Sequence, residues 1–241
     1  MNLRELKAKL SLTYRYRIEL HAHTTPVSVC SQITPKEMAE TYKNLGYSAV
    51  VVTNHFIYQH NGSEKEEYID FFLNDFEQTE KYGKELGIKV YLGAELRFTE
   101  NSNDYLLFGV DKKILEEIYD YLPYGIENFR SKYIMQDSVF IQAHPMRNGM
   151  ETVEPALLDG IEVFNMHPAH NSKVGLASVY AKENNHLIVT AGSDFHHPNV
   201  DHEGLAAIRA THLPEDTFGL AKLLKEGDFL LEIGRDNIIL R

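Results

Sequence analysis

Two histidines separated by one residue, His21 and His23, end a run of β-forming residues that starts at Tyr16. Because successive side chains of a strand point to opposite faces, both imidazoles project from one face and can bind the same metal ion. The same alternation puts Glu19 on that face, where its carboxylate is placed to orient a ligand imidazole. Leu20 and its apolar neighbours are expected to face the covering helices.

Four more apolar runs end in residues of the same kinds. The residues that end them are His55, Glu95, His144 and the pair Asp194 and His196. Imidazoles and carboxylates without a set of thiolates suit borderline divalent ions such as Zn, Mn or Fe. Together with the first two histidines these donors exceed what one tetrahedral ion uses. We therefore expect two or three ions, which can clamp reacting oxygens and generate hydroxide near neutral pH.

The elements that would bring these residues together follow from hydrophobic spacing. Short β-branched or apolar runs alternate with longer stretches of helical spacing, which is typical of βα units around a parallel sheet. The predicted strands are residues 16–23, 48–54, 89–97, 105–110, 138–144, 160–165 and 187–193, with weaker candidates at 205–210 and 229–233. The predicted helices are residues 34–46, 65–86, 112–122, 172–184 and 215–225.

Seven or eight parallel strands with intervening helices predict an α/β fold closed into a barrel, with the active groups at the carboxyl ends of the strands. An open doubly wound sheet would place its site in the same way. No Pro-, Gly- or Ser-rich linker interrupts the chain, so we expect residues 1–241 to form one catalytic domain.

The charge of the chain argues against long nucleic acids as partners. Its 24 Lys and Arg residues against 35 Asp and Glu residues give a formal net charge of −11, which offers no general attraction to polyanions or anionic membranes. No apolar run approaches the ~20 residues of a membrane helix, and the charged N-terminal segment lacks the apolar core of a secretory signal. The single cysteine, Cys30, also favours the cytoplasm. It is itself expected to be a small buried residue, the alternatives being a soft metal ligand or a redox-sensitive neighbour of the centre.

Six short motifs occur in order along the chain. They are His-Ala-His (21–23), Thr-Asn-His (53–55), Gly-Ala-Glu (93–95), Ala-His-Pro (143–145), Gly-Ile-Glu-Val (160–163) and Gly-Ser-Asp-Phe-His (192–196). In these motifs the chain resembles the PHP superfamily, named for polymerase and histidinol phosphatase domains. The resemblance implies a distorted (β/α)7 barrel that holds two or three divalent metal ions and hydrolyses phosphoesters. It also implies three sets of metal ligands: His21, His23, Glu95 and Asp194; Glu95 and His144; and His55 and His196.

The chain departs from the family pattern where the third ion would bind. Asn54 stands where members often have an Asp before the second-strand histidine, and Cys30 lies where many have another Asp. Members also often supply a histidine soon after the glutamate, yet none occurs here between His60 and His144. Asp104 is the nearest replacement, either as a ligand or as a turn or strand cap.

Cationic side chains expected at the rim favour a phosphorylated substrate. Arg147 follows Ala-His-Pro closely and could donate two hydrogen bonds to a phosphate, the alternative being a solvated loop arginine. His170 and Lys173, with His167, follow the sixth predicted strand, and we expect substrate contacts there, with ordinary loop positions as the alternative.

These residues predict a hydrolase of phosphoric esters in which a metal-activated hydroxide attacks phosphorus and Arg147 orients the group. Asp194, His196 or water would protonate the leaving oxygen. The short span from Glu95 to His144 leaves little room for an inserted lid, so we predict a small phosphomonoester resembling histidinol phosphate. The alternatives are nucleotides or short oligonucleotides as substrates, an amidohydrolase reaction, and a non-catalytic metal-binding or regulatory module. The sequence indicates no oligomeric state.

Overall fold

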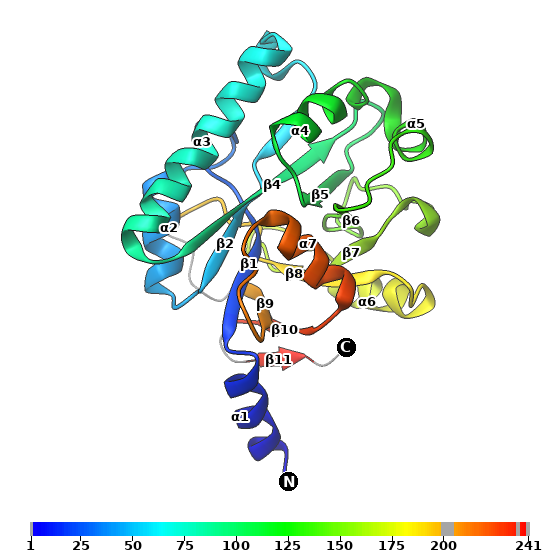
Figure 1. Cartoon of the computed structure of the whole chain (residues 1–241). Coiled ribbons are helices and arrows are strands. Elements are labelled where there is room, and N and C mark those ends of the chain that lie inside the picture. Colours follow the sequence, from blue (N-terminus) through cyan, green and yellow to red (C-terminus); the bar gives the residue numbers. More distant parts are fainter. Residues whose placement is uncertain (1, 199–204, 235–236, 240–241) are drawn as a thin grey trace.

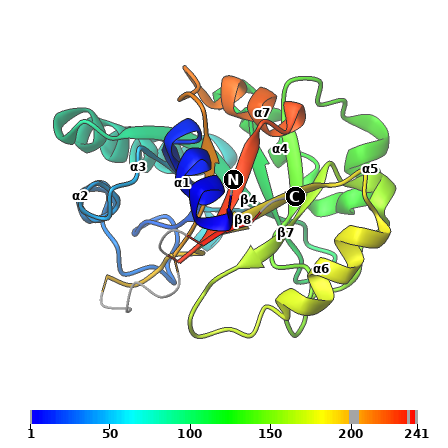
Figure 2. The ribbon, with the colours of Figure 1, turned by 90° about the horizontal axis from the view of Figure 1, so that it is seen from below.

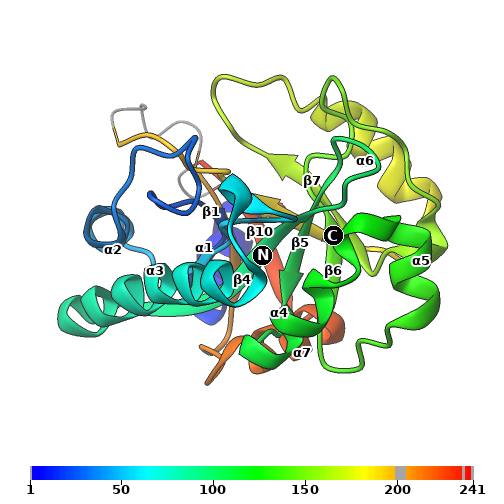
Figure 3. The ribbon, with the colours of Figure 1, turned by 90° about the horizontal axis from the view of Figure 1, so that it is seen from above.

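One curled sheet with helices packed around its outside forms the body of the protein (Figures 1 and 3). A computed structural model describes residues 2–198, 205–234 and 237–239. The sheet runs in the order β11-β10-β9-β1-β2-β4-β5-β6-β7-β8, and β3 pairs with β4. The strands are β1 (Tyr16–Ala22), β2 (Ala49–Val52), β3 (His55–Ile57), β4 (Lys89–Arg97), β5 (Asp104–Phe108), β6 (Val139–Gln142), β7 (Gly160–Asn165), β8 (Ile188–Gly192), β9 (Ala206–Ala210), β10 (Phe229–Ile233) and β11 (Asn237–Ile239). The α-helices are α1 (Leu3–Thr13), α2 (Pro35–Asn44), α3 (Lys65–Leu86), α4 (Lys112–Tyr119), α5 (Gly125–Lys132), α6 (Val174–Glu183) and α7 (Thr217–Glu226).

The helix boundaries have local causes in the sequence. Thr34 caps α2 by accepting a hydrogen bond from the Glu37 amide, while the Glu37 carboxylate accepts one from the Thr34 amide, and Pro35 fits the first helical position. α3 ends at Gly87, which takes the left-handed conformation with φ 70°. These signals confirm the predicted start of α2 and the predicted end of α3.

The sheet closes on itself where β8 returns to β1. Beyond β8, Phe195 forms a parallel bridge with Ala22. The His23 amide donates to the Phe195 carbonyl at 3.0 Å, and the Phe195 amide donates to the His21 carbonyl at 3.3 Å. This seam makes the fold a distorted barrel rather than an open doubly wound sheet, as predicted.

Not all of the predicted strands are parallel: β9 is antiparallel to both β1 and β10, and β5 also runs against the predicted direction. β5 is antiparallel to both β4 and β6, whereas the sequence pattern led us to expect parallel strands. The connection from Arg97 to Asp104 is too short for the crossover that a parallel pair requires, so the chain turns back directly. This reversal puts Asp104, the first residue of β5, opposite Arg97 at the carboxyl end of β4.

Two helices and two strands, α1, α5, β3 and β11, were not predicted from the sequence. The predicted end of α4, at residue 122, was too late, because the helix ends at Tyr119.

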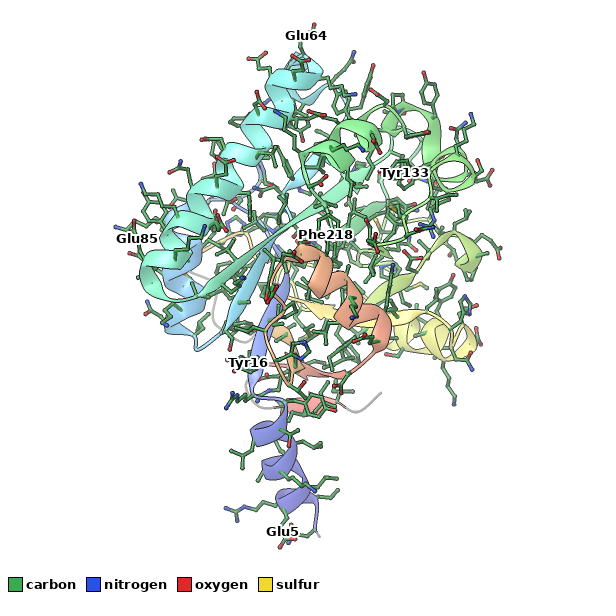
Figure 4. All side chains as sticks on the ribbon, viewed as in Figure 1. Glu5, Tyr16, Glu64, Glu85, Tyr133 and Phe218 are labelled. Carbon is green, nitrogen blue, oxygen red and sulfur yellow. The ribbon has the colours of Figure 1, made fainter. Side chains whose placement is uncertain are left out.

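Helix α1 has no buried residue. It projects from the bottom of the barrel in Figure 1, points toward the viewer in Figure 2, and carries Glu5 at its far tip in Figure 4. A helix without a buried face lacks the apolar contacts that stabilise most helices in proteins.

The face of β1 opposite its histidines is apolar, as predicted. Ile18 and Leu20 belong to the same buried cluster as Leu220 and Leu224 of α7, and Ala22 packs in the cluster that includes α2. β1 therefore separates an apolar core from a polar centre.

Among the described residues, no helix is both long enough and apolar enough to span a membrane.

Candidate metal centre

Glu95, at the carboxyl end of β4, lies at the middle of the centre and is 1% exposed. Its Oε1 is 3.1 Å from His21 Nε2 and 3.2 Å from His144 Nε2. Its Oε2 is 2.8 Å from His55 Nδ1 and 3.5 Å from His23 Nε2. The two carboxylate oxygens thus face different pairs of imidazoles.

Asp194 is the second carboxylate and follows β8 directly. Its Oδ1 lies 3.5 Å from His21 Nε2, and 3.4 Å from both His23 Nε2 and His196 Nδ1. Its backbone is in the left-handed region with φ 52°, and that of His144 has φ 31°. Both residues thus turn the chain sharply at the end of a strand, which directs their side chains into the centre.

Hydrogen bonds fix the tautomers of three histidines. His21 Nδ1 lies 2.9 Å from Glu162 Oε1, His23 Nδ1 lies 3.2 Å from Ser28 Oγ, and His196 Nδ1 lies 2.8 Å from the Asp194 carbonyl. The Ser28 hydroxyl donates to Asn54 Oδ1, so Ser28 Oγ accepts from His23. Each Nδ1 therefore carries a proton, and in the neutral ring each Nε2 presents a lone pair, which is the state that binds a metal ion.

Several donor atoms of the centre are buried without forming a hydrogen bond to another described residue. They include His21 Nε2, His23 Nε2, His55 Nδ1 and Glu95 Oε2. Buried polar atoms normally have partners, because an unpaired one costs about 1–3 kcal/mol. Unpaired nitrogen and oxygen atoms that converge on one space are the donor set that a divalent ion would satisfy, so the residues present fit such an ion.

The centre contains four overlapping groups of donor residues, and within each group one ligand atom per residue lies within 4.8 Å of the others. Together the groups contain every metal ligand predicted from the sequence. The groups are His21, Glu95 and His144; His21, His23 and Asp194; His23, His55 and His196; and His55, Glu95 and Asp104. The second group contains three of the four residues in the first ligand set that the family resemblance implied, and the first group contains both residues of the second set. The third group adds His23 to the pair His55 and His196.

The imidazoles keep both carboxylates ionised. Burial would raise the pKa of Glu95, but the adjacent His21 and His55 hold it well below its usual range. Burial opposes ionisation of Asp194 in the same way, yet His21, the adjacent His23 and other nearby imidazoles hold its pKa well below the usual range. Near neutral pH these groups are therefore acceptors for a cation and not sources of protons.

Asp104 reaches the edge of the centre and is already paired. Its two oxygens accept hydrogen bonds from Arg97 Nε at 2.7 Å and Arg97 NH2 at 2.8 Å, and its Oδ2 lies 3.8 Å from His144 Nε2. Asp104 is the first residue of β5, and β5 runs antiparallel to β4. The start of β5 therefore lies beside the carboxyl end of β4, among the ligands at the other strand ends.

Arg147 points into the centre instead of into solvent. Its NH2 donates to Asp194 Oδ2 at 2.6 Å and to Asn165 Oδ1 at 2.8 Å, and its side chain is 15% exposed. His170 and Lys173 line a cavity of about 460 Å³ that also contains Asn165. Asn165 contacts Asp194 and thus links this cavity to the centre.

His167, in the same cavity, has the opposite tautomer from His21, His23 and His196. Its Nδ1 accepts a hydrogen bond from the Ala169 amide at 3.1 Å, so a neutral ring carries its proton on Nε2. Burial, with His196 and His170 nearby, lowers the pKa of His167 to about 4, although Asp194 opposes the shift. His167 is therefore a neutral hydrogen-bond donor at pH 7.

Glu162 of β7, and not Glu19, orients a ligand imidazole, so this prediction was wrong. Glu19 accepts hydrogen bonds from the backbone amides of Leu20, His21 and Ser193, and thereby supports the seam between β1 and β8. Glu162 holds His21 Nδ1 with one oxygen and the His144 amide with the other. The signal for it was a carboxylate inside an otherwise apolar strand.

The prediction for Cys30 was also wrong. The residue is exposed, and the nearby His196 and His55 lower the pKa of its thiol to about 6, although partial burial opposes the shift. Asn54 has a supporting role: its amide donates to Asp75 of α3 at 2.7 Å, and its Oδ1 accepts from the Thr24 amide. A carboxylate on α3 thus lies behind Asn54, which the sequence pattern did not indicate.

Known proteins share both sequence motifs and fold with this chain. The family model of the PHP domain matches residues 19–235. No curated protein matches the sequence. Among solved structures, a two-domain protein from Bacteroides vulgatus that contains a predicted PHP-like metal-dependent phosphoesterase has 16% identity and a TM-score of 0.64. That match covers 94% of this chain and 66% of the other, so this chain spans just under two thirds of that protein.

Two further structures have similar folds. A candidate metal-dependent phosphoesterase from Bifidobacterium adolescentis has 14% identity and a TM-score of 0.50, over 76% of this chain and 89% of the other. An amidohydrolase from Chromobacterium violaceum with bound sulfate and no metal has 15% identity and a TM-score of 0.52, over 88% of this chain and 97% of the other. At such identities the likeness concerns the fold alone.

Proposed function

The chain belongs to the PHP domain family, and from this premise we propose that it is a metal-dependent phosphoesterase that hydrolyses a small phosphomonoester. The observation that carries the proposal is the convergence of unpaired imidazole nitrogens on two ionised carboxylates. The proposed ligands are His21, His23, His55, Glu95, His144, Asp194 and His196, with Asp104 at the edge. Bound divalent ions would supply positive charge for the phosphoryl oxygens and lower the pKa of water to yield a nucleophile near neutral pH.

Arg147 and His167 would bind the phosphoryl group. Asp194 and Asn165 hold the Arg147 guanidinium in one orientation, and its Nε makes no hydrogen bond to another described residue. His167 offers a neutral N–H donor in the adjoining cavity. A guanidinium held this way can meet a phosphate oxygen without the entropy loss of ordering a free side chain.

The low pKa of Asp194 removes it as the proton donor. Its carboxylate stays ionised beside His21 and accepts from Arg147, so its role is to bind and to position. Protonation of the leaving oxygen therefore falls to water, or to His196 in a state in which its Nε2 is protonated and binds no ion. Of the three donors predicted from the sequence, we propose that Asp194 is not used.

A small substrate is supported by the size of the cavity and by the acidic chain. The cavity beside Asn165, about 460 Å³, is lined by His170 and Lys173 and suits one phosphorylated metabolite. The sulfate in the Chromobacterium structure shows that a tetrahedral oxyanion binds to a similar fold. Histidinol phosphate is the model substrate, with nucleotides and short oligonucleotides as the alternative. The cytoplasmic location stays a prediction.

Phosphate release from a panel of phosphorylated metabolites, nucleotides, amides and lactones tests the proposal. With Mn²⁺ or Zn²⁺ we expect release from a phosphomonoester, and a loss of at least ~100-fold in His144→Ala because a ligand is removed. His212→Ala is the matched control, since His212 is exposed, and should keep full activity. Turnover of amides or lactones alone, or metal binding without any turnover, would reject the proposed reaction.

A further inference from the structure

Asp75 of α3 is a buried carboxylate that lies outside the proposed ligand set and is 3% exposed. Its Oδ2 accepts hydrogen bonds from Asn54 Nδ2 at 2.7 Å and from the Thr24 hydroxyl, whereas its Oδ1 has no partner among the described residues. Burying a carboxylate with one oxygen unpaired costs stability. The two residues that it does contact adjoin proposed ligands, because Thr24 follows His23 and Asn54 precedes His55.

The side-chain amide of Asn54 uses all four of its hydrogen-bonding positions. Its Nδ2 donates to Asp75 Oδ2 and, at 2.8 Å, to Thr24 Oγ1. Its Oδ1 accepts from the Thr24 backbone amide at 2.7 Å and from Ser28 Oγ at 2.9 Å. A backbone amide can only donate and a carboxylate can only accept, so these two neighbours prevent the nitrogen and oxygen of Asn54 from exchanging places. Asp75 therefore helps to decide that an acceptor faces Ser28.

Ser28 is left with one arrangement of its hydroxyl group. Its single hydrogen goes to Asn54 Oδ1, so both of its lone pairs accept. One accepts from the His55 backbone amide at 3.0 Å, and the other from His23 Nδ1 at 3.2 Å. His23 Nδ1 therefore carries a proton, and in the neutral ring the lone pair lies on Nε2. That nitrogen faces the centre, 3.4 Å from Asp194 Oδ1.

We propose that Asp75 is a positioning residue for the metal centre. Through Asn54 and Ser28 it fixes the tautomer of His23, and through the same serine it holds the His55 backbone. The inference rests on the proposed metal centre and adds to it a carboxylate that no ion would touch. In the opposite tautomer His23 would present an N–H group, which cannot bind a metal ion, to the centre.

Burial of the path from Asp75 to His23 strengthens this role. Thr24 and Ser28 are 0% exposed and Asn54 is 1% exposed, so bulk water does not reach the groups that connect the carboxylate to the imidazole. A hydrogen bond lost at one end of such a path is not simply replaced by solvent, and the remaining donors and acceptors must rearrange.

Nitrogen-15 NMR of the histidine side chains tests the proposal without relying on turnover. Spectra are recorded on the full-length protein after chelation, near neutral pH, and comparison with His23→Gln identifies the signals of His23. In wild type we expect a protonated Nδ1 and an unprotonated Nε2. Asp75→Asn should give the same result, because its amide oxygen can accept as the carboxylate does. Asp75→Leu removes the acceptor with little change in volume and should give a mixture of both tautomers.

Calorimetric titration with Zn²⁺ gives a second measurement. Asp75→Leu should bind Zn²⁺ at least ~10-fold more weakly at one site, the range for lost support of a ligand, whereas Asp75→Asn should match wild type. Asp70→Leu is the matched control, since Asp70 is exposed on the same helix and pairs with Lys112. It should leave the tautomer of His23 and the Zn²⁺ affinity unchanged.

A structural role alone would give a different result. A chelated Asp75→Leu protein that is less stable but keeps the wild-type tautomer and Zn²⁺ affinity would overturn the proposal, and so would a proton on His23 Nε2 in wild type. If Asp75→Leu does not fold, Ser28→Ala cuts the same path at its other end, and an unchanged tautomer there would also overturn it. The expected tautomers without phosphate release from wild type would overturn the proposed function and leave the role of Asp75 standing.

Discussion

At the scale of single residues, the centre depends on hydrogen bonds behind the ligands. Glu162 contacts His21, the His144 amide and the side chain of Asn165, and Asn165 in turn contacts Asp194. One carboxylate of β7 thus connects residues from three other strand ends. Such a network holds each ligand in one tautomer and one orientation before any ion arrives.

Asp75 offers a pH-dependent test at this scale. Burial raises the pKa of its carboxyl from 3.8 to about 6, although hydrogen bonds from Thr24 and Asn54 oppose the shift. Between those values the folded protein keeps a proton that the unfolded chain has released, so the free energy of unfolding falls as pH rises toward 6. From pH 4.5 to pH 7 the loss is ~2 kcal/mol. We expect Asp75→Asn to lack this loss in urea unfolding with chelator present.

The control for this prediction lies on the same helix. Asp70→Asn removes an exposed carboxylate that pairs with Lys112, and its pH dependence should match that of wild type. If the stabilities of wild type and Asp75→Asn changed in parallel between the two pH values, the raised pKa of Asp75 would be disproved.

At the scale of elements, β8 must pass very close to β1 and β7. A Cβ built on Gly192 would lie 2.3 Å from Glu162 Oε1 and 2.5 Å from His21 Cβ. We therefore expect Gly192→Ala to displace Glu162 from His21 and to weaken metal binding by ~10- to 100-fold, the range for lost support of a ligand. Calorimetric titration with Zn²⁺ measures the effect.

Gly175 in α6 provides the matched substitution. Its Cβ would meet nothing within 4 Å, so Gly175→Ala should leave metal affinity unchanged and stabilise the helix by up to ~1 kcal/mol. Equal affinities for Gly192→Ala and wild type would mean that the Glu162 contact does not support the centre.

The sequence predicted the elements that follow simple periodicity. Alternation along β1 placed His21 and His23 together, and apolar runs predicted the strands that end in Glu95 and His144. The sequence did not predict the reversal of β5, because that depends on the length of one connection. It also did not predict the partner of His21, because two inward carboxylates, Glu19 and Glu162, compete for that role. Contacts between distant strands are set by the curvature of the whole sheet, which local periodicity does not encode.

At the scale of the whole molecule, the proposed ligands come from both sides of the seam. His21 lies on β1 and His23 directly after it, while Asp194 and His196 follow β8. The bridge between Ala22 and Phe195 joins these two segments. An ion bound by residues from both segments would add bonds across the place where the sheet closes. Metal binding and closure of the barrel are thus expected to be coupled.

Removal of metal should therefore destabilise the fold. An ion present at 100 times its Kd adds ~2.7 kcal/mol, and each kcal/mol changes Tm by ~2–4 °C in a protein of this size. We expect a chelator to lower Tm by about 5–10 °C and added Zn²⁺ to restore it. Hydrogen exchange should increase first at residues 21–23 and 193–196.

His144→Ala serves as the comparison, because a variant with a damaged centre should lose less stability on chelation. An unchanged Tm in a protein whose metal content has fallen would show that closure of the barrel does not depend on the ions.

The left-handed backbone of His144 and Asp194 implies a compromise between stability and use. Residues other than glycine hold such conformations at a cost of about 1 kcal/mol or more each, and glycine would relieve it. A descendant of this protein that no longer needed its centre could gain stability simply by acquiring glycine at those two positions. Histidine and aspartate at these positions thus trade some stability of the fold for two donor side chains in the centre.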